Sequence, residues 1–189
     1  MARSIISSYR SAGASTTSTG LVFRTMEAKL PFDPIDEAAR QWGLRWTAVP
    51  EMRAVTSLMR VQQLVLAELD EILRPHGLTF ARYEALVLLT FSSRGSLPLG
   101  KIGERLQVHP TSVTSIVRRL EASGFVVRRD SPSDGRAVLA EITDEGRAVV
   151  ERATADLTSA DFGLGALDDD ALTRLSELLR PVRREAGDF

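Results

Sequence analysis

Short hydroxyl and guanidinium side chains alternate with apolar ones between Thr111 and Leu120. At about 100° per residue of an α-helix, the polar side chains lie on or beside the face opposite an apolar stripe. Hydroxyls donate and accept hydrogen bonds, and guanidinium groups donate them in a planar fork. Such a surface suits phosphate oxygens and base edges in the DNA major groove, which admits an α-helix. The predicted contact residues are Thr111, Ser112, Thr114, Ser115, Arg118 and Arg119.

A predicted β-hairpin follows this helix. Residues 125–129 are β-branched, aromatic or basic, and residues 137–142 alternate between apolar and other side chains, as strands do. Between them, residues 130–136 contain the Pro, Gly, Ser and Asp typical of a turn. The basic residues of the hairpin, which we expect to contact DNA, are Arg128, Arg129 and Arg136.

A preceding helix and a tight turn position the polar face. Leu99, Ile102 and Leu106 recur at helical spacing, and the fixed φ of Pro110 suits the first turn of the next helix. The apolar stripe of that next helix comprises Val113, Ile116, Val117 and Leu120. A helix-turn-helix followed by a two-stranded hairpin is a winged helix. The predicted fold class is therefore mainly α with a small β-hairpin wing, flanked by N- and C-terminal helices.

Charge is distributed unevenly along the 189 residues, whose net charge is −1. The segment from Arg94 to Arg136 holds eight basic and four acidic residues, so the remainder of the chain is acidic. Positive charge concentrated at the predicted helix and hairpin favours a nucleic-acid partner. Considered alone, this patch is explained equally well as a solvated surface of mixed charge.

The chain lacks the residues that characterise several classes of enzyme and metal-binding protein. The chain has no cysteine, and neither His76 nor His109 has a partner at metal-ligand spacing. It also lacks a glycine-rich phosphate loop and a G-x-S-x-G motif, while the acidic run 168–170 suits the start of a helix. We therefore expect no catalytic residues, no metal and no cofactor. No apolar run approaches the roughly 20 residues that span a bilayer, so we expect a cytoplasmic protein without a membrane partner.

Further elements surround the winged helix. Residues 1–30 are predicted to form a disordered tail and 31–48 an accessory helix, in which Asp33 is the N-cap and Trp42 and Trp46 share one face. These tryptophans are expected to pack against the body of the protein or a partner subunit; a role in lining a ligand pocket is the alternative. Thr79 is predicted to cap the helix ending at Phe91, and 92–96 to form a loop.

Amphipathic helices are predicted both before and after the winged helix, at 51–74 and 143–186. A winged-helix core at about 79–142 needs few additional helices, so their apolar stripes must be buried elsewhere. A symmetric homodimer achieves this and places two DNA-contacting helices on a palindrome. A monomer with a larger helical bundle is the alternative.

From about Glu51 to Ala160 the chain resembles the MarR family of bacterial transcription regulators, and a MarR-type domain is predicted over 51–186. The resemblance rests on Leu78-Thr79 with Tyr83, the helix 99–106, the sequence RRLEASGFV, and Asp134-Gly135-Arg136 followed by Ile-Thr-x-x-Gly at 142–146. It implies that Arg136 enters the minor groove and that Asp134 steadies this arginine and the recognition helix. An arginine at a turn tip agrees with this role, because the narrow minor groove is strongly negative.

The resemblance also implies a repressor released by a small, often aromatic ligand that binds between the dimer helices and the DNA-binding domain. The predicted pocket residues are Trp42, Arg60, Tyr83 and Glu84, with Arg82 and His76 as further candidates. The helix bearing Trp42 is similar to one in the urate-responsive branch, with Glu84 as the pocket acid. Ile116 stands where that branch has an arginine, which argues against urate.

A winged-helix protein-interaction module without specific DNA binding is the alternative function. Its interface core would favour aromatic residues. The outward Thr, Ser and Arg side chains between Thr111 and Arg119 favour DNA instead.

Overall fold

The computed structural model describes residues 30–130 and 137–189, so the predicted tail lies almost wholly outside the described residues. The chain divides into two compact units, residues 1–53 and 54–189. The first unit contains α1 (Pro34–Gly43) and the start of the long helix α2 (Val49–Leu73).

Helix α1 begins as predicted but ends before its second tryptophan. Asp33 Oδ1 accepts hydrogen bonds from the backbone N–H groups of Ile35 (2.8 Å) and Asp36 (3.4 Å), which makes Asp33 the N-cap. The helix ends at Gly43, so the prediction that Trp46 lies on a helical face is wrong. Instead, the indole N–H of Trp42 donates to the carbonyl of Thr47 at 2.7 Å, and the two indole rings pack with centroids 4.8 Å apart.

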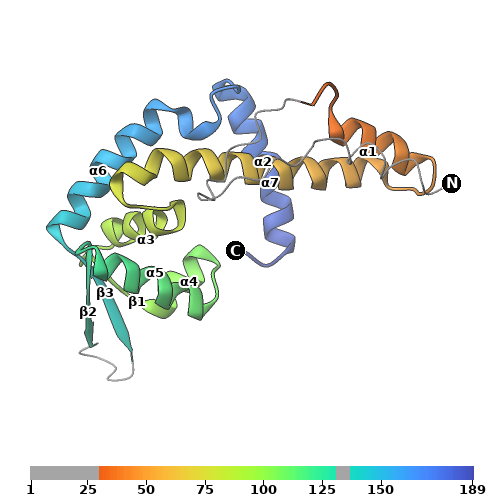
Figure 1. The fold of residues 1–189 in the computed structure, drawn as a ribbon. Helices are drawn as coiled ribbons and strands as arrows, with labels where there is room; N and C mark the ends of the chain where they lie inside the picture. Colours follow the sequence, from red (N-terminus) through yellow and green to blue (C-terminus); the bar gives the residue numbers. More distant parts are fainter. Residues whose placement is uncertain (1–29, 131–136) are drawn as a thin grey trace, which may run out of the picture. The chain divides into compact units, whose positions relative to one another are not determined.

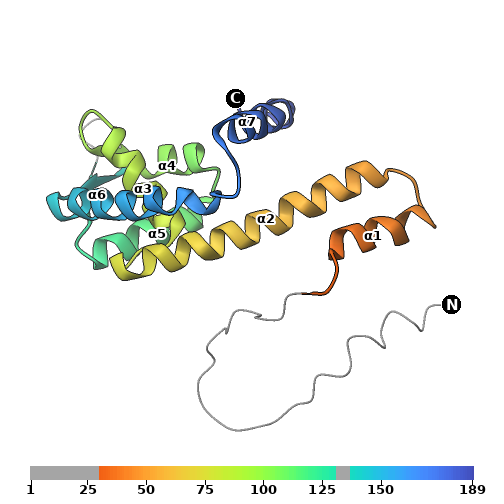
Figure 2. The same cartoon turned by 90° about the horizontal axis from the view of Figure 1, so that it is seen from above.

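The second unit is a winged helix with additional helices, which confirms the predicted fold class (Figures 1 and 2). After α2 and a short 3₁₀ turn, its elements follow in the order α3 (Phe80–Phe91), β1 (Ser96–Pro98), α4 (Leu99–Leu106), α5 (Pro110–Ala122), β2 (Val126–Asp130), β3 (Val138–Ile142), α6 (Asp144–Ser159) and α7 (Asp169–Glu185).

The sheet has three strands rather than the two predicted. Its order is β1-β3-β2, and both pairings are antiparallel. Ser96, predicted as the end of a loop, begins β1 and pairs with Glu141, while Leu97 pairs with Ala140. Strand β1 covers the edge of β3 that the hairpin leaves open, and Leu97 packs against the core.

The core of this unit lies where the end of α2 meets α3, α4, α5, α6 and the sheet. From α5, Val113, Val117 and Leu120 are each at most 1% exposed. Ile116, the fourth member of the predicted stripe, is only partly buried. The largest fully buried side chains from the other helices are Leu73, Leu86, Leu89, Ile102 and Leu157.

Helix α3 is not capped as predicted. Thr79 occupies the N-cap position, but its side chain caps no backbone N–H. The backbone N–H of Phe80 donates instead to Asp70 Oδ1 on α2 at 2.7 Å, and the Thr79 hydroxyl accepts from Arg82 Nε at 3.2 Å. A side chain ten residues away therefore satisfies the helix start, which local sequence does not reveal.

The start of α6 is fastened closely to the end of α5. The Thr143 hydroxyl donates to the carbonyl of Gly124 at 2.7 Å and accepts from the backbone N–H of Gly146 at 3.0 Å. A Cβ atom on Gly146 would lie 2.2 Å from the carbonyl oxygen of Phe125 and 2.8 Å from a side-chain carbon of Ile142. In the Thr-x-x-Gly sequence, Thr143 thus caps α6, and Gly146 provides the space that the start of α6 needs beside the Phe125 carbonyl.

Replacing Gly146 with alanine should destabilise the protein by about 1–3 kcal/mol, because the added methyl group would collide with backbone. Gly100 on α4 provides a matched control, since a Cβ there meets nothing within 4 Å. Gly100→Ala should be neutral or stabilise by roughly 0.5–1 kcal/mol, because alanine favours the helix. Urea unfolding followed by circular dichroism measures both changes, and equal stability of the two variants would contradict the close contact.

Candidate functional site

Helix α5 presents the polar face predicted to contact DNA. His109 Nδ1 accepts a hydrogen bond from the backbone N–H of Thr111 at 3.3 Å, and Pro110 is the first helical residue. Burial of Val113, Val117 and Leu120 turns the opposite face outward. Of the predicted contact residues, Ser115 is partly buried and the others are exposed: Thr111, Ser112, Thr114, Arg118 and Arg119.

The arginines of α5 and β2 differ in their partners. Among the described residues, the guanidinium groups of Arg118 and Arg119 form no hydrogen bond or ion pair. On β2, Arg128 Nε donates to Glu121 at 2.8 Å and Arg129 Nε to Glu141. Both β2 pairs are exposed, so each contributes little to stability and leaves its arginine accessible to another anion.

Sequence reasoning did not identify these two carboxylate partners. Glu141 lies diagonally across the β2–β3 ladder from Arg129, since Arg129 pairs with Leu139. Strand alternation places Arg129 and Glu141 on one face once the register is known, and the turn length alone does not fix that register. Glu121 contacts Arg128 only because β2 folds back beside the end of α5.

Asp134 and Arg136 lie within residues 131–136, outside the described residues. The strands on either side are paired up to Asp130 and Val138, so the hairpin that supports this turn is present.

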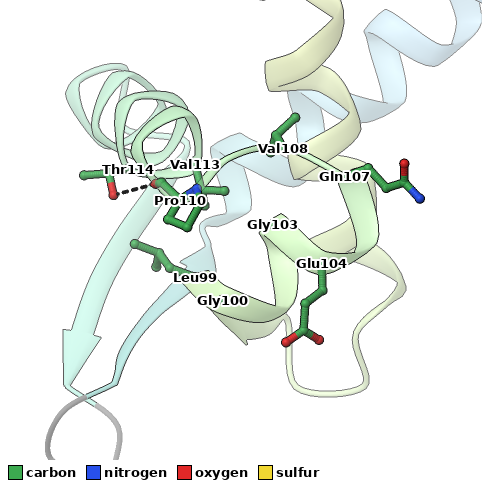
Figure 3. Close-up of a pocket in the computed structure, with 9 residues that line it drawn as sticks. All are labelled: Leu99, Gly100, Gly103, Glu104, Gln107, Val108, Pro110, Val113 and Thr114. Atoms are coloured by element: carbon green, nitrogen blue, oxygen red, sulfur yellow. Dashed lines mark hydrogen bonds between the residues drawn. The ribbon is translucent and has the colours of Figure 1, made fainter. Parts of the chain in front are cut away.

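An apolar groove of about 530 Å³ lies between α4 and α5 (Figure 3). Gln107 adopts a left-handed conformation (φ 52°) at the turn between the helices, and Gly103 packs so closely that a Cβ would lie 3.1 Å from Val113. The Thr114 hydroxyl donates to the carbonyl of Pro110 at 3.0 Å, so its proton is not available for a hydrogen bond to a ligand. The lining residues are Leu99, Gly100, Gly103, Glu104, Gln107, Val108, Pro110, Val113 and Thr114.

A second groove, of about 370 Å³, lies between α2 and α3. Its one ionisable lining residue is Glu84, which is about half-buried. Burial raises the pKa of the Glu84 carboxyl above its usual value, because the charged form loses solvation. Within the described ranges, this carboxyl has no hydrogen bond or ion pair. The remaining lining residues are Gln62, Val65, Leu66, Leu69, Phe80 and Ala81.

Of the four predicted pocket residues, Tyr83 and Glu84 lie together. They share a smaller hollow of about 220 Å³, although the Tyr83 hydroxyl pairs with Thr154 Oγ1 at 2.8 Å. Arg60 is exposed on α2 and lines neither groove, and Trp42 belongs to the unit of residues 1–53.

The two further candidates are also engaged elsewhere. His76 Nε2 lies 2.7 Å from Asp156 Oδ2, and Arg82 donates to Thr79.

The described part of the chain contains no cluster of three or more His, Cys, Asp or Glu side chains arranged to hold a metal ion. None of its helices has both the length and the apolar character needed to cross a membrane.

Comparison with known proteins gives the family. The MarR family model matches residues 81–138, from α3 to the start of β3. The structure of Sco5413, a MarR family transcriptional regulator from Streptomyces coelicolor, matches with a TM-score of 0.71 and 59% sequence identity, covering 75% of this chain and 99% of that one. This chain belongs to the MarR family of transcriptional regulators.

Other MarR-type relatives extend the comparison. The HTH-type transcriptional repressor Rv2887 of Mycobacterium tuberculosis is 34% identical over 128 residues, covering 68% of this chain and 84% of the relative. The structure of Sco3205, a MarR family regulator from Streptomyces coelicolor in complex with DNA, matches with a TM-score of 0.67 and 28% identity over 75% of this chain and 90% of that one. The MarR resemblance inferred from the sequence is thereby confirmed.

The raised pKa of Glu84 predicts a pH-dependent effect of Glu84→Gln. Because the folded pKa is higher than the unfolded one, the wild type loses stability as pH rises through and above about 4.5. The glutamine variant escapes this loss, so it should melt at a higher temperature than the wild type at pH 7 and not at pH 4. Thermal unfolding at both pH values tests this, and an equal difference at the two would contradict it.

Proposed function

We propose that this MarR-family chain is a sequence-specific DNA-binding regulator that acts as a homodimeric repressor released by a small ligand. The exposed polar face of α5, anchored by its buried apolar stripe, is the observation that supports DNA binding most directly. Arg118 and Arg119 keep their guanidinium groups without protein partners among the described residues and thus available to phosphates and bases.

In this proposal α5 enters the major groove and the wing contacts the adjacent DNA. The exposed Thr111, Ser112 and Thr114 lie in the first turns of α5, where recognition helices contact base edges. Arg128 and Arg129 extend the basic surface along β2, and in this proposal Arg136 enters the minor groove and Asp134 has the supporting role that the family resemblance implies. The DNA complex of the relative Sco3205 supports a DNA-binding role for this fold.

Arg118→Ala and Arg136→Ala should each weaken operator binding, with a cost of roughly 1–3 kcal/mol for a good base contact. Arg152→Ala is a matched control, because Arg152 lies on α6 and pairs with Glu145. Binding to the DNA upstream of the protein's own gene, footprinted and titrated in salt, measures the effect. The wild type should protect a palindrome and show a steep salt dependence.

Wild-type affinity in both arginine variants would contradict the assigned contacts. No DNA binding by folded protein at low salt would contradict the regulator itself and favour the protein-interaction module.

Uncovered apolar side chains on two helices support the homodimer. On α2, Val55, Leu58, Met59, Val61 and Leu64 are each at least 43% exposed. On α7 no residue is buried, and Leu178 is 74% exposed. Exposed apolar side chains in this number favour an interface, and a symmetric dimer would bury them against the second copy.

Not every helix of the proposed dimerisation segments, 51–74 and 143–186, is available to contact a second copy. Helix α6 already buries Val149, Val150, Ala153 and Leu157 within its own chain. In this proposal the first part of α2 and helix α7 supply the dimer contacts, while α6 connects α7, and the end of α2 connects its first part, to the winged-helix core at about 79–142.

The wild-type chain should sediment at micromolar concentration with twice its monomer mass of 20.7 kDa. Leu178→Asp should shift the equilibrium toward monomer, because it places a charge in the apolar interface. Ser176→Asp, on the same helix at an exposed polar position, should leave the dimer intact. A wild-type monomer under these conditions would contradict the dimer, and equal effects of both substitutions would contradict the assigned face.

The groove between α2 and α3 is the proposed effector site. It is bounded by the proposed dimer helix on one side and by α3 of the winged-helix core on the other. A ligand bound there would contact both the proposed dimer helix and the winged-helix core. This suits an effector that causes the protein to release DNA. The name of the relative Rv2887, a transcriptional repressor, supports repression as the regulatory sense.

A further inference from the structure

We propose that the groove between α2 and α3 selects small organic cations, with Glu84 as the group that binds the positive charge. This deepens the proposed function, since it names the chemical class of effector for the site already assigned. The occupant is an apolar body ending in an ammonium group.

The charge preference follows from the surroundings of Glu84. Its carboxyl is the one ionisable group among the lining residues, and the part of the chain that the structure describes offers it no cation and no hydrogen-bond donor. A half-buried carboxylate without a partner has lost solvation that nothing replaces. An ammonium group on the ligand replaces that solvation, whereas a ligand carboxylate would be repelled.

The remaining lining residues suit the apolar part of such a ligand. Val65, Leu66 and Leu69 of α2 provide aliphatic surface, and Phe80 of α3 provides an aromatic ring beside the acid. An aromatic face attracts a cation within about 6 Å of its centre. The volume of about 370 Å³ is in the range of small-molecule sites, which span roughly 300–1,000 Å³. The side-chain amide of Gln62 adds one neutral polar group.

The groove between α4 and α5 does not share this property. Its acid, Glu104, is exposed and accepts a hydrogen bond from Lys101 Nζ at 2.7 Å. Its hydroxyl, on Thr114, already donates to the Pro110 carbonyl. The polar side chains of that groove are therefore engaged, and it offers no unpaired charge. Glu104 thus provides a matched control for Glu84: the same residue type, in the other groove.

The test compares three probes with one apolar body: 4-phenylbutylammonium, 4-phenylbutanol and 4-phenylbutyrate. Calorimetric titration of the full-length protein at pH 7.5 should show that the cation binds most tightly and the anion least tightly. Glu84→Gln should weaken cation binding roughly tenfold, as expected for one charge-assisted hydrogen bond. It should leave the alcohol nearly unchanged, and Glu104→Gln should leave all three unchanged. Thermal melting confirms that both variants are folded.

Three results would overturn cation selection: no cation binding up to millimolar concentration, tighter binding of the anion, or an unchanged cation affinity in Glu84→Gln. A parallel measurement of operator binding separates this inference from the proposed function. If the protein binds no DNA, the regulator assignment fails while the titration still reports on Glu84. If it binds DNA and the anion alone releases it, the regulator assignment stands and cation selection fails.

Discussion

Burial of one apolar stripe on α5 determines the geometry of the candidate interface. Val113, Val117 and Leu120 are almost completely removed from solvent, and each contributes roughly 1.5–3 kcal/mol relative to an exposed side chain. Rotating α5 about its axis would expose these groups, so the same burial fixes which residues face outward. The polar face of α5, including Arg118 and Arg119, therefore points outward because of how the helix packs and not because partners within the chain hold its side chains.

Backbone geometry helps to position the elements that follow α5. Gly124 adopts a left-handed conformation at the end of α5, and Gly146 allows α6 to begin against the Phe125 carbonyl. Between them the β2–β3 hairpin is paired to Asp130 and Val138, with β1 on its other edge. The hairpin that carries the wing is therefore held at its base by these junctions and along one edge by β1. This gives the basic residues of β2 a defined position beside α5.

Periodicity predicted the elements whose stripes are long enough to repeat, including both helices of the helix-turn-helix and the β2–β3 hairpin. It missed β1, because three residues do not establish an alternation and the pairing of Leu97 with Ala140 is long-range. It also misplaced Trp46, because the apolar spacing was extended past Gly43, a residue type that often ends a helix and ends α1 here. The partners of Arg128 and Arg129 depend on register and chain reversal, so they became visible only with the fold.

Tyr83 and Glu84 are neighbours on α3, but they differ in whether the fold gives their side chains a hydrogen-bond partner. Tyr83 is buried and its hydroxyl is paired with Thr154 on α6, so it stabilises the packing of α3. Glu84, one position along, lines the groove with no partner in the described residues, and its charged form loses solvation there. Helix α3 also packs on α5, and residues of both line a hollow that includes Arg82 and Arg119. In the proposed mechanism, a ligand that pairs with Glu84 would act on the helix that packs against α5, so a local change of charge would reach the proposed DNA-contacting helix through a single packed interface.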